Sequence, residues 1–178
     1  MKIYLIANNS KLTNDWIHRF NKNIKINKDD FVVRFNKCLL NEIFNGYTTH
    51  YFSRDTLDNF TGFNNDELAY NFLKNNKIIF NFIFNKIHYN KNINKIIKLK
   101  KKNNLNIEQL FQLNIVNKLS FSSGFIAINY FLNKYKTAEI ILVGFNFYNK
   151  KINWHNFKYE YLTICKLARE TNRIKLYI

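Results

Sequence analysis

The stretch AEIILVGF, residues 138–145, carries the strongest strand signal in the chain and decides the fold. A short, nearly unbroken apolar run is typical of a strand covered on both faces, as in the middle of a parallel sheet. Elsewhere, short apolar runs alternate with amphipathic stretches, which is typical of an α/β protein. The sequence therefore predicts an α/β fold with a single doubly wound, mostly parallel sheet flanked by helices, a Rossmann-like nucleotide-binding domain over residues 1–178.

The other expected elements lie mostly before this stretch. Strands are expected at residues 2–7, 31–35, 48–52, 77–84 and 173–178, and helices at residues 12–20, 66–73, 107–113, 122–134 and 157–169. Polar turns follow the strands at residues 8–10, 36, 54–55 and 146–155. Because ligands of such sheets bind beyond the carboxyl ends of the strands, we expect these turns to converge on one edge.

The composition indicates one globular domain, and its basic charge has two possible explanations. A chain of 178 residues with 47% hydrophobic residues can bury a core and is too apolar for a disordered protein. Its net charge of +16 favours a nucleotide, a nucleic acid or an anionic lipid surface, without choosing among them. The many lysines also match what an AT-rich genome encodes.

The basic segment at residues 85–106 is either a solvated surface helix or a lip for an anionic acceptor or membrane headgroups.

Several classes of protein are disfavoured. The two cysteines, Cys38 and Cys165, form no CxxC, which argues against a disulfide scaffold or zinc module and suits a reducing cytoplasm. No run approaches the roughly 18 apolar residues of a spanning helix. We therefore expect a cytoplasmic protein, with any contact to the inner membrane face being peripheral. DxD, HExxH and HxH are absent, so we expect no metal and no other cofactor.

Two polar segments could hold a phosphate or nucleotide. Ser122, Ser123 and Gly124 open a predicted helix, where free backbone N–H groups and the helix dipole attract anions. The alternative is that serine is only the helix cap. Asn8, Asn9 and Ser10 follow the first strand, where α/β proteins hold nucleotides, although an ordinary turn has the same composition.

Arg34 is a charged residue within the apolar strand FVVRF. Such a side chain must find a partner or solvent, so it either holds internal carboxylate or carbonyl groups or lies near a site. Asn36 follows at strand spacing and is expected on the same face. If Arg34 lies near a site, Asn36 would contact a nucleotide there.

His155 is the best candidate for a catalytic base. It lies in WHNFKYE, at the expected entry to a helix, and an imidazole has an ordinary pKa of about 6.5. Five residues separate it from Glu160, which turns the two side chains away from each other on a helix. His155 is therefore expected to precede the helix, with Glu160 packing inward from its second turn. Of the other histidines, His50 is the most interesting, near the end of the third strand.

The order of these motifs resembles the sialyltransferase superfamily. The likeness consists of VVRFN at 32–36, SSG at 122–124, ILVGFNFY at 141–148 and HxxxxE at 155–160. The loop at residues 8–10 stands where that family has a loop rich in Gly, Asn and Ser. The resemblance implies a metal-independent inverting glycosyltransferase. It would move sialic acid, or a related acid sugar, from a CMP donor to a bacterial surface glycan such as lipopolysaccharide or capsule.

The resemblance also implies roles for individual residues. Asn8 and Asn36 would contact the CMP portion, with Asn9 and Ser10 in the same loop. The Ser122–Gly124 segment would hold its phosphate or ribose, His155 would deprotonate the acceptor hydroxyl, and Glu160 would brace the nucleotide-binding helix end. Apart from the resemblance, Arg34, His50, Tyr148, Trp154 and Tyr159 are candidates for supporting residues, with Tyr148 and Tyr159 as hydrogen-bond donors.

Two other functions stay open at this point. A nucleic-acid-binding module would use the positive charge together with exposed aromatic side chains. A non-catalytic relative of the transferase would bind CMP without turnover.

Overall fold

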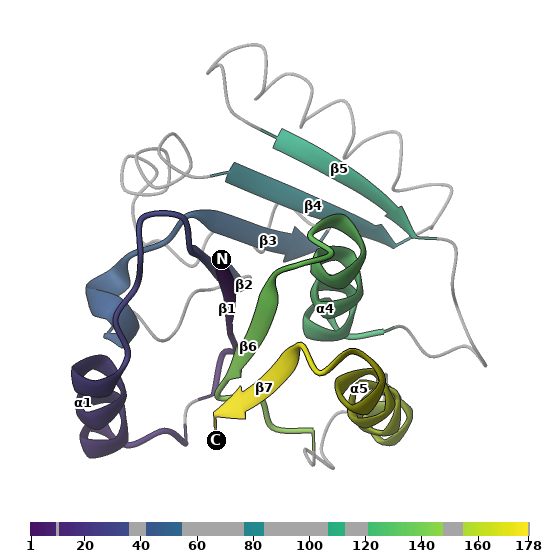
Figure 1. Cartoon of the computed structure of the whole chain (residues 1–178). Coiled ribbons are helices and arrows are strands. Elements are labelled where there is room, and N and C mark those ends of the chain that lie inside the picture. Colours follow the sequence, from purple (N-terminus) through teal and green to yellow (C-terminus); the bar gives the residue numbers. More distant parts are fainter. Residues whose placement is uncertain are drawn as a thin grey trace.

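The computed structural model describes residues 1–9, 11–35, 42–54, 77–83, 107–112, 121–147 and 155–177. Their strands form one seven-stranded sheet in the order β5-β4-β3-β2-β1-β6-β7, and every neighbouring pair is parallel (Figure 1). The strands are β1 (Lys2–Ile6), β2 (Phe31–Phe35), β3 (His50–Arg54), β4 (Lys77–Ile83), β5 (Ile107–Gln112), β6 (Glu139–Val143) and β7 (Ile174–Tyr177). The described helices are α1 (Asn14–Asn23), η1 (Ile43–Gly46), α4 (Ser123–Lys134) and α5 (Phe157–Thr171).

The predicted α/β class and the parallel sheet are confirmed. The stretch at residues 138–145 supplies β6, which pairs with β1 on one side and β7 on the other. Leu142 and Val143 are no more than 1% exposed, as expected for a strand covered on both faces. The helix expected at residues 66–73 and the basic segment at 85–106 lie outside the described residues.

One expected element is wrong: residues 107–113 were expected as a short helix, and Ile107–Gln112 form strand β5. β5 pairs with β4 over six residues, from Ile78↔Ile107 to Ile83↔Gln112. A helix of this length is marginal by itself, because nucleation costs more than its few hydrogen bonds return. Pairing with β4 satisfies the backbone groups along one side of this segment at once, so the tertiary partner decides the structure.

The helices cover the sheet on both faces (Figure 1). α4 and α5 pack on one face, where Phe131 and Ile164 join Leu5 and Leu142 in one apolar core. α1 packs on the other face, where Ile17 and Phe20 join residues of the neighbouring strands. Alternate residues of β1 point into the two cores, so this central strand links both layers.

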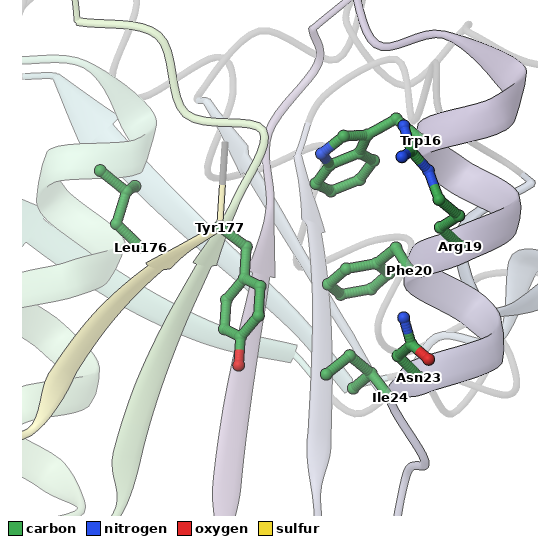
Figure 2. Close-up of a pocket in the computed structure, with 7 residues that line it drawn as sticks. All are labelled: Trp16, Arg19, Phe20, Asn23, Ile24, Leu176 and Tyr177. Atoms are coloured by element: carbon green, nitrogen blue, oxygen red, sulfur yellow. The ribbon is translucent and has the colours of Figure 1, made fainter.

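The face of α1 that packs on the sheet carries aromatic side chains. Thr13 caps the helix, its Oγ1 accepting from the Trp16 N–H at 3.3 Å. Trp16 stacks on Phe20 with ring centroids 5.1 Å apart, and Phe20 meets Tyr177 of β7 edge-on at 5.8 Å (Figure 2). These ring contacts therefore pack α1 against β7, an edge strand of the sheet.

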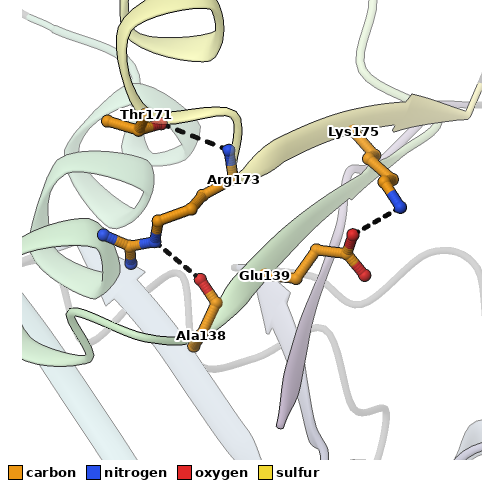
Figure 3. Close-up of polar contacts among 5 residues, drawn as sticks. All are labelled: Ala138, Glu139, Thr171, Arg173 and Lys175. Atoms are coloured by element: carbon orange, nitrogen blue, oxygen red, sulfur yellow. Dashed lines mark hydrogen bonds and ion pairs between the residues drawn. The ribbon is translucent and has the colours of Figure 1, made fainter.

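Arg173, the residue before β7, donates hydrogen bonds to carbonyl groups at and just after the end of α4. Figure 3 shows its contact with Ala138. Its Nε donates to the Ala138 carbonyl at 2.9 Å, and its Nη2 donates to the Tyr135 carbonyl at 2.6 Å and the Leu132 carbonyl at 3.4 Å. The last carbonyls of a helix lack partners within the helix, and a cation there also matches the helix dipole.

We expect Arg173→Ala to lower the free energy of unfolding by about 2 kcal/mol, because three partly buried carbonyls lose a charged donor. Urea unfolding measures this. Lys175→Gln is the control, since Lys175 makes only a surface ion pair with Glu139 at 2.5 Å, and it should leave the curve unchanged. Equal stability of the two variants would contradict the capping role.

Tyr4, in β1, is fully buried, and its hydroxyl has no hydrogen-bond partner among the described residues. Burial, followed by the negative charge of Asp30, raises the pKa of Tyr4 from 10.0 to about 12. Between these values the unfolded chain releases a proton that the folded chain keeps. Stability is therefore lost as the pH rises from about 10 to 12.

We expect Tyr4→Phe to remove this loss. At pH 8 the variant should equal the parent or exceed it by about 1 kcal/mol, because an unpaired buried hydroxyl is gone. At pH 11.5 its advantage should grow, since each pKa unit corresponds to about 1.4 kcal/mol. Urea titrations of both proteins at the two pH values measure the difference. An advantage that does not change with pH would contradict the raised pKa.

Candidate functional site

The strand order places a candidate site at the carboxyl ends of β1 and β6. From β1 the chain builds the sheet outward through β2 to β5, and then crosses to the other side of β1 to add β6 and β7. Such a reversal opens a crevice between the loops that leave the two strands, where α/β sheets bind ligands. The strands end together here, since the Ala7 N–H donates to the Val143 carbonyl and the Gly144 N–H donates to the Tyr177 carbonyl, both at 2.9 Å.

The loop after β1 is shaped by its two asparagines. The Asn8 amide donates to the Phe35 carbonyl at 2.9 Å, which ties the end of β1 to the end of β2. Asn9 Oδ1 accepts from the Lys11 N–H at 3.1 Å, an Asx turn that leads toward α1. The loop thus has the position expected for it. Ser10 and Asn36 lie outside the described residues.

The loop after β6 depends on Gly144, whose φ is +69°. A Cβ at this position would lie 2.8 Å from Leu12 Cδ1, so a side chain would collide as well as strain the backbone. Leu12 therefore packs directly over the end of β6, and the loops after β1 and β6 are in contact.

A bidentate polar contact at this edge joins two motifs that lie 38 residues apart in the sequence. Glu160 Oε1 accepts from the Ser122 N–H at 2.7 Å, and Glu160 Oε2 accepts from the Ser122 hydroxyl at 2.6 Å. Ser122 Oγ also accepts from the Phe125 N–H at 3.1 Å and so caps α4. The SSG segment and the HxxxxE element thus meet at one place.

Glu160 is completely buried in the first turn of α5, beside the N-terminus of α4. A carboxylate in this position interacts favourably with the positive ends of both helix dipoles. The expectation that Glu160 packs inward is confirmed, although it lies in the first turn rather than the second. The helix begins at Phe157, capped by Asn156, whose Oδ1 accepts from the Tyr159 N–H at 3.0 Å.

The mouth of α4 keeps free donors. Within the described residues, the N–H groups of Ser123 and Gly124 have no hydrogen-bond acceptor, as is usual for the first positions of a helix. At Gly124, the position of an added Cβ lies 2.6 Å from Phe145 Cε1. Its immediate neighbour is thus the Phe145 ring, which brings the loop after β6 against α4.

His155 lies directly before Asn156, so it precedes α5 as expected. The residue is half-buried, and its ring meets Phe157 edge-on at 5.4 Å. Because α5 begins beside α4, His155 stands at the same edge of the sheet as Ser122. Tyr159, half-exposed, stacks on Phe121 at 6.0 Å between the starts of the two helices. Tyr148 and Trp154 lie outside the described residues.

Arg34 and His50 occupy structural positions. Arg34 is 2% exposed, and it donates from Nε to Thr48 Oγ1 at 2.9 Å and from Nη2 to the Ile43 carbonyl. It thereby holds η1 and the approach to β3, in line with the carbonyl-holding interpretation. His50 begins β3 at the amino edge instead of lying near a strand end. The centroid of its ring lies 4.3 Å from that of Phe31, in the core and away from the crevice. The expected position of His50 near a strand end is therefore wrong, and the residue lies too far from the crevice for a supporting role.

Comparisons of the chain with protein-family models, curated proteins and solved structures find no match. In the part of the chain that the structure describes, no helix is both long and apolar enough to cross a bilayer. The same residues contain no group of three or more His, Cys, Asp or Glu side chains placed to hold a metal ion.

The joint between Ser122 and Glu160 makes a testable prediction for stability. Ser122→Ala should lower the free energy of unfolding by about 1–2 kcal/mol, because it removes both a helix cap and a charged hydrogen bond. Glu160→Gln should cost about 2 kcal/mol. Because the two residues share one interaction, the double variant should lose less than the sum, by at least about 0.5 kcal/mol.

Thr13→Ala serves as the matched control, since it removes a helix cap on the opposite face of the sheet. Combined with Glu160→Gln, its effect should be additive. Urea unfolding of the two double-mutant cycles measures both couplings. Equal couplings in the two cycles would mean that Ser122 and Glu160 act independently.

Proposed function

We propose that the protein is a metal-independent inverting glycosyltransferase that moves sialic acid, or a related acid sugar, from a CMP donor to a bacterial surface glycan. The observation that carries the proposal is the bidentate contact between Ser122 and Glu160. It brings the SSG helix mouth and the HxxxxE element to the carboxyl edge of the sheet, where ligands of this fold class bind. Resemblance of motifs alone would not require them to meet.

The mouth of α4 is suited to the phosphate of the donor. The N–H groups of Ser123 and Gly124 lie at the positive end of the helix dipole and have no acceptor among the described residues. Glu160 adds a negative charge nearby, but both of its oxygens already accept hydrogen bonds from Ser122, which leaves the N–H groups of Ser123 and Gly124 available. The remaining amides can therefore bind the phosphate and stabilise the charge that develops on it as CMP departs.

His155 is the proposed general base. In the reaction the acceptor hydroxyl oxygen forms a bond to the anomeric carbon while the bond from that carbon to the phosphate oxygen breaks. CMP leaves with the electron pair, and the hydroxyl proton passes to the imidazole. The configuration at the anomeric carbon is inverted because attack and departure occur on opposite faces. Asn8, at the end of β1, would contact the nucleoside, as the resemblance of motifs implies.

The donor class is tested by calorimetric titration with CMP, UMP, GDP and UDP. We expect CMP to bind at least about tenfold more tightly than the others, since hydrogen bonds specific to the cytosine base are worth this much. Equal affinity for all four would contradict the proposal. Salt-sensitive binding of oligonucleotides without any preference for CMP would support the nucleic-acid module instead.

His155→Ala should reduce transfer from CMP-sialic acid to lipopolysaccharide oligosaccharides by about 10²–10⁴-fold, because the proton acceptor is lost. Its affinity for CMP should stay within about twofold of the parent, since the base binds the acceptor side. His18→Ala is the control, an exposed histidine on α1 that should change neither value. CMP binding with no transfer by the parent protein would identify a non-catalytic relative.

A further inference from the structure

A groove separate from the Ser122–Glu160 contact lies on the opposite face of the sheet. It is bounded by α1 on one side and by the end of β7 on the other (Figure 2). Its volume is about 440 Å³, within the range of small-ligand sites. The lining residues are Trp16, Arg19, Phe20, Asn23, Ile24, Leu176 and Tyr177.

The floor of the groove is aromatic and the rim is polar. Phe20 lies between Trp16, which stacks on it, and Tyr177, which meets it edge-on. Arg19 and Asn23 lie one turn apart on α1, and both are exposed. The Arg19 Nε donates to the Asp15 carbonyl at 3.4 Å, and the rest of its guanidinium has no other partner among the described residues. The Arg19 guanidinium is therefore available to bind a ligand beside the apolar floor of the groove.

We propose that this groove binds an acidic sugar residue of the acceptor glycan. The half-buried rings of Trp16 and Tyr177, with Phe20 buried between them, offer a surface to the apolar face of a sugar ring. The Arg19 guanidinium can bind a carboxylate through two parallel hydrogen bonds, and the Asn23 amide can bind ring hydroxyls. The assignment to the acceptor rests on the proposed transferase function, whereas the acid-sugar chemistry rests on the groove itself.

The composition of the lining favours a sugar over single-stranded nucleic acid. A nucleic-acid groove follows the backbone with several cations and presents open aromatic faces for successive bases. Among the lining residues Arg19 is the only cation. Trp16 and Phe20 also stack on each other, so part of their ring faces is already covered. One charge and one short aromatic surface match a single anionic ring.

The position of the groove connects it to the crevice. Tyr177 accepts from the Gly144 N–H through its carbonyl, so one wall ends at the loop after β6. Trp16 lies in the first turn of α1, which follows the loop after β1. Leu12 separates the two places, packed against Gly144. A glycan held in the groove can therefore extend past Leu12 toward the donor.

The test uses 3′-sialyllactose and lactose as probes, with the full chain saturated with CMP so that the proposed donor site is filled. Binding is measured by calorimetry and by the fluorescence of Trp16, assigned through Trp16→Phe. We expect 3′-sialyllactose to bind more tightly than lactose and Arg19→Gln to weaken it about tenfold, the usual effect of losing a charged hydrogen bond. Lys22→Gln is the control, because Lys22 carries the same charge on α1 outside the groove.

Three results would overturn the proposal. One is equal affinity of the parent and Arg19→Gln for 3′-sialyllactose, including no binding by either. Another is displacement of the probe by an oligonucleotide. The third is a dimer, detected by light scattering, that Arg19→Gln or Trp16→Phe dissociates, since a second copy would then occupy the groove. The CMP titration of the same samples separates this outcome from failure of the transferase function, because the groove variants should bind CMP like the parent.

Discussion

The architecture at the carboxyl edge depends on one buried carboxylate. Glu160 has no exposure to solvent, and a buried charge is costly unless hydrogen bonds and favourable dipoles compensate. Ser122 supplies two donors, and the N-termini of α4 and α5 supply the dipoles. The two helices must therefore begin side by side, and everything attached to their first turns shares one edge of the sheet.

Apolar packing in the core also fixes the positions of these helices and loops. α4 buries seven residues against the middle of the sheet, and Gly124 lets its first turn approach the Phe145 ring. On the other face Gly144 lets Leu12 cover the end of β6. Close packing at these two glycines brings the loops after β1 and β6 and the mouth of α4 together, so the candidate site is a consequence of packing as much as of polar contacts.

Local patterns predicted most of the fold. The apolar runs gave the positions of β1, β2, β4, β6 and β7, and the capping signal at Ser122 gave the start of α4. The residues at 107–112 show where local patterns are insufficient, because their strand exists through pairing with β4. Similarly, Arg34 and His50 were ambiguous polar residues in apolar strands, and only their neighbours show that they pack and bond inside the structure.

The sequence by itself determined the class of fold, the parallel sheet and the polar motifs that follow its strands, because apolar periodicity and helix capping are local properties of the chain. Only the tertiary structure decided that Ser122 meets Glu160 across 38 residues and that Phe145 fills the space beside Gly124. It also formed the groove between α1 and β7 from residues near the two ends of the chain. Such contacts arise from the order in which strands join the sheet, and short-range patterns do not record that order.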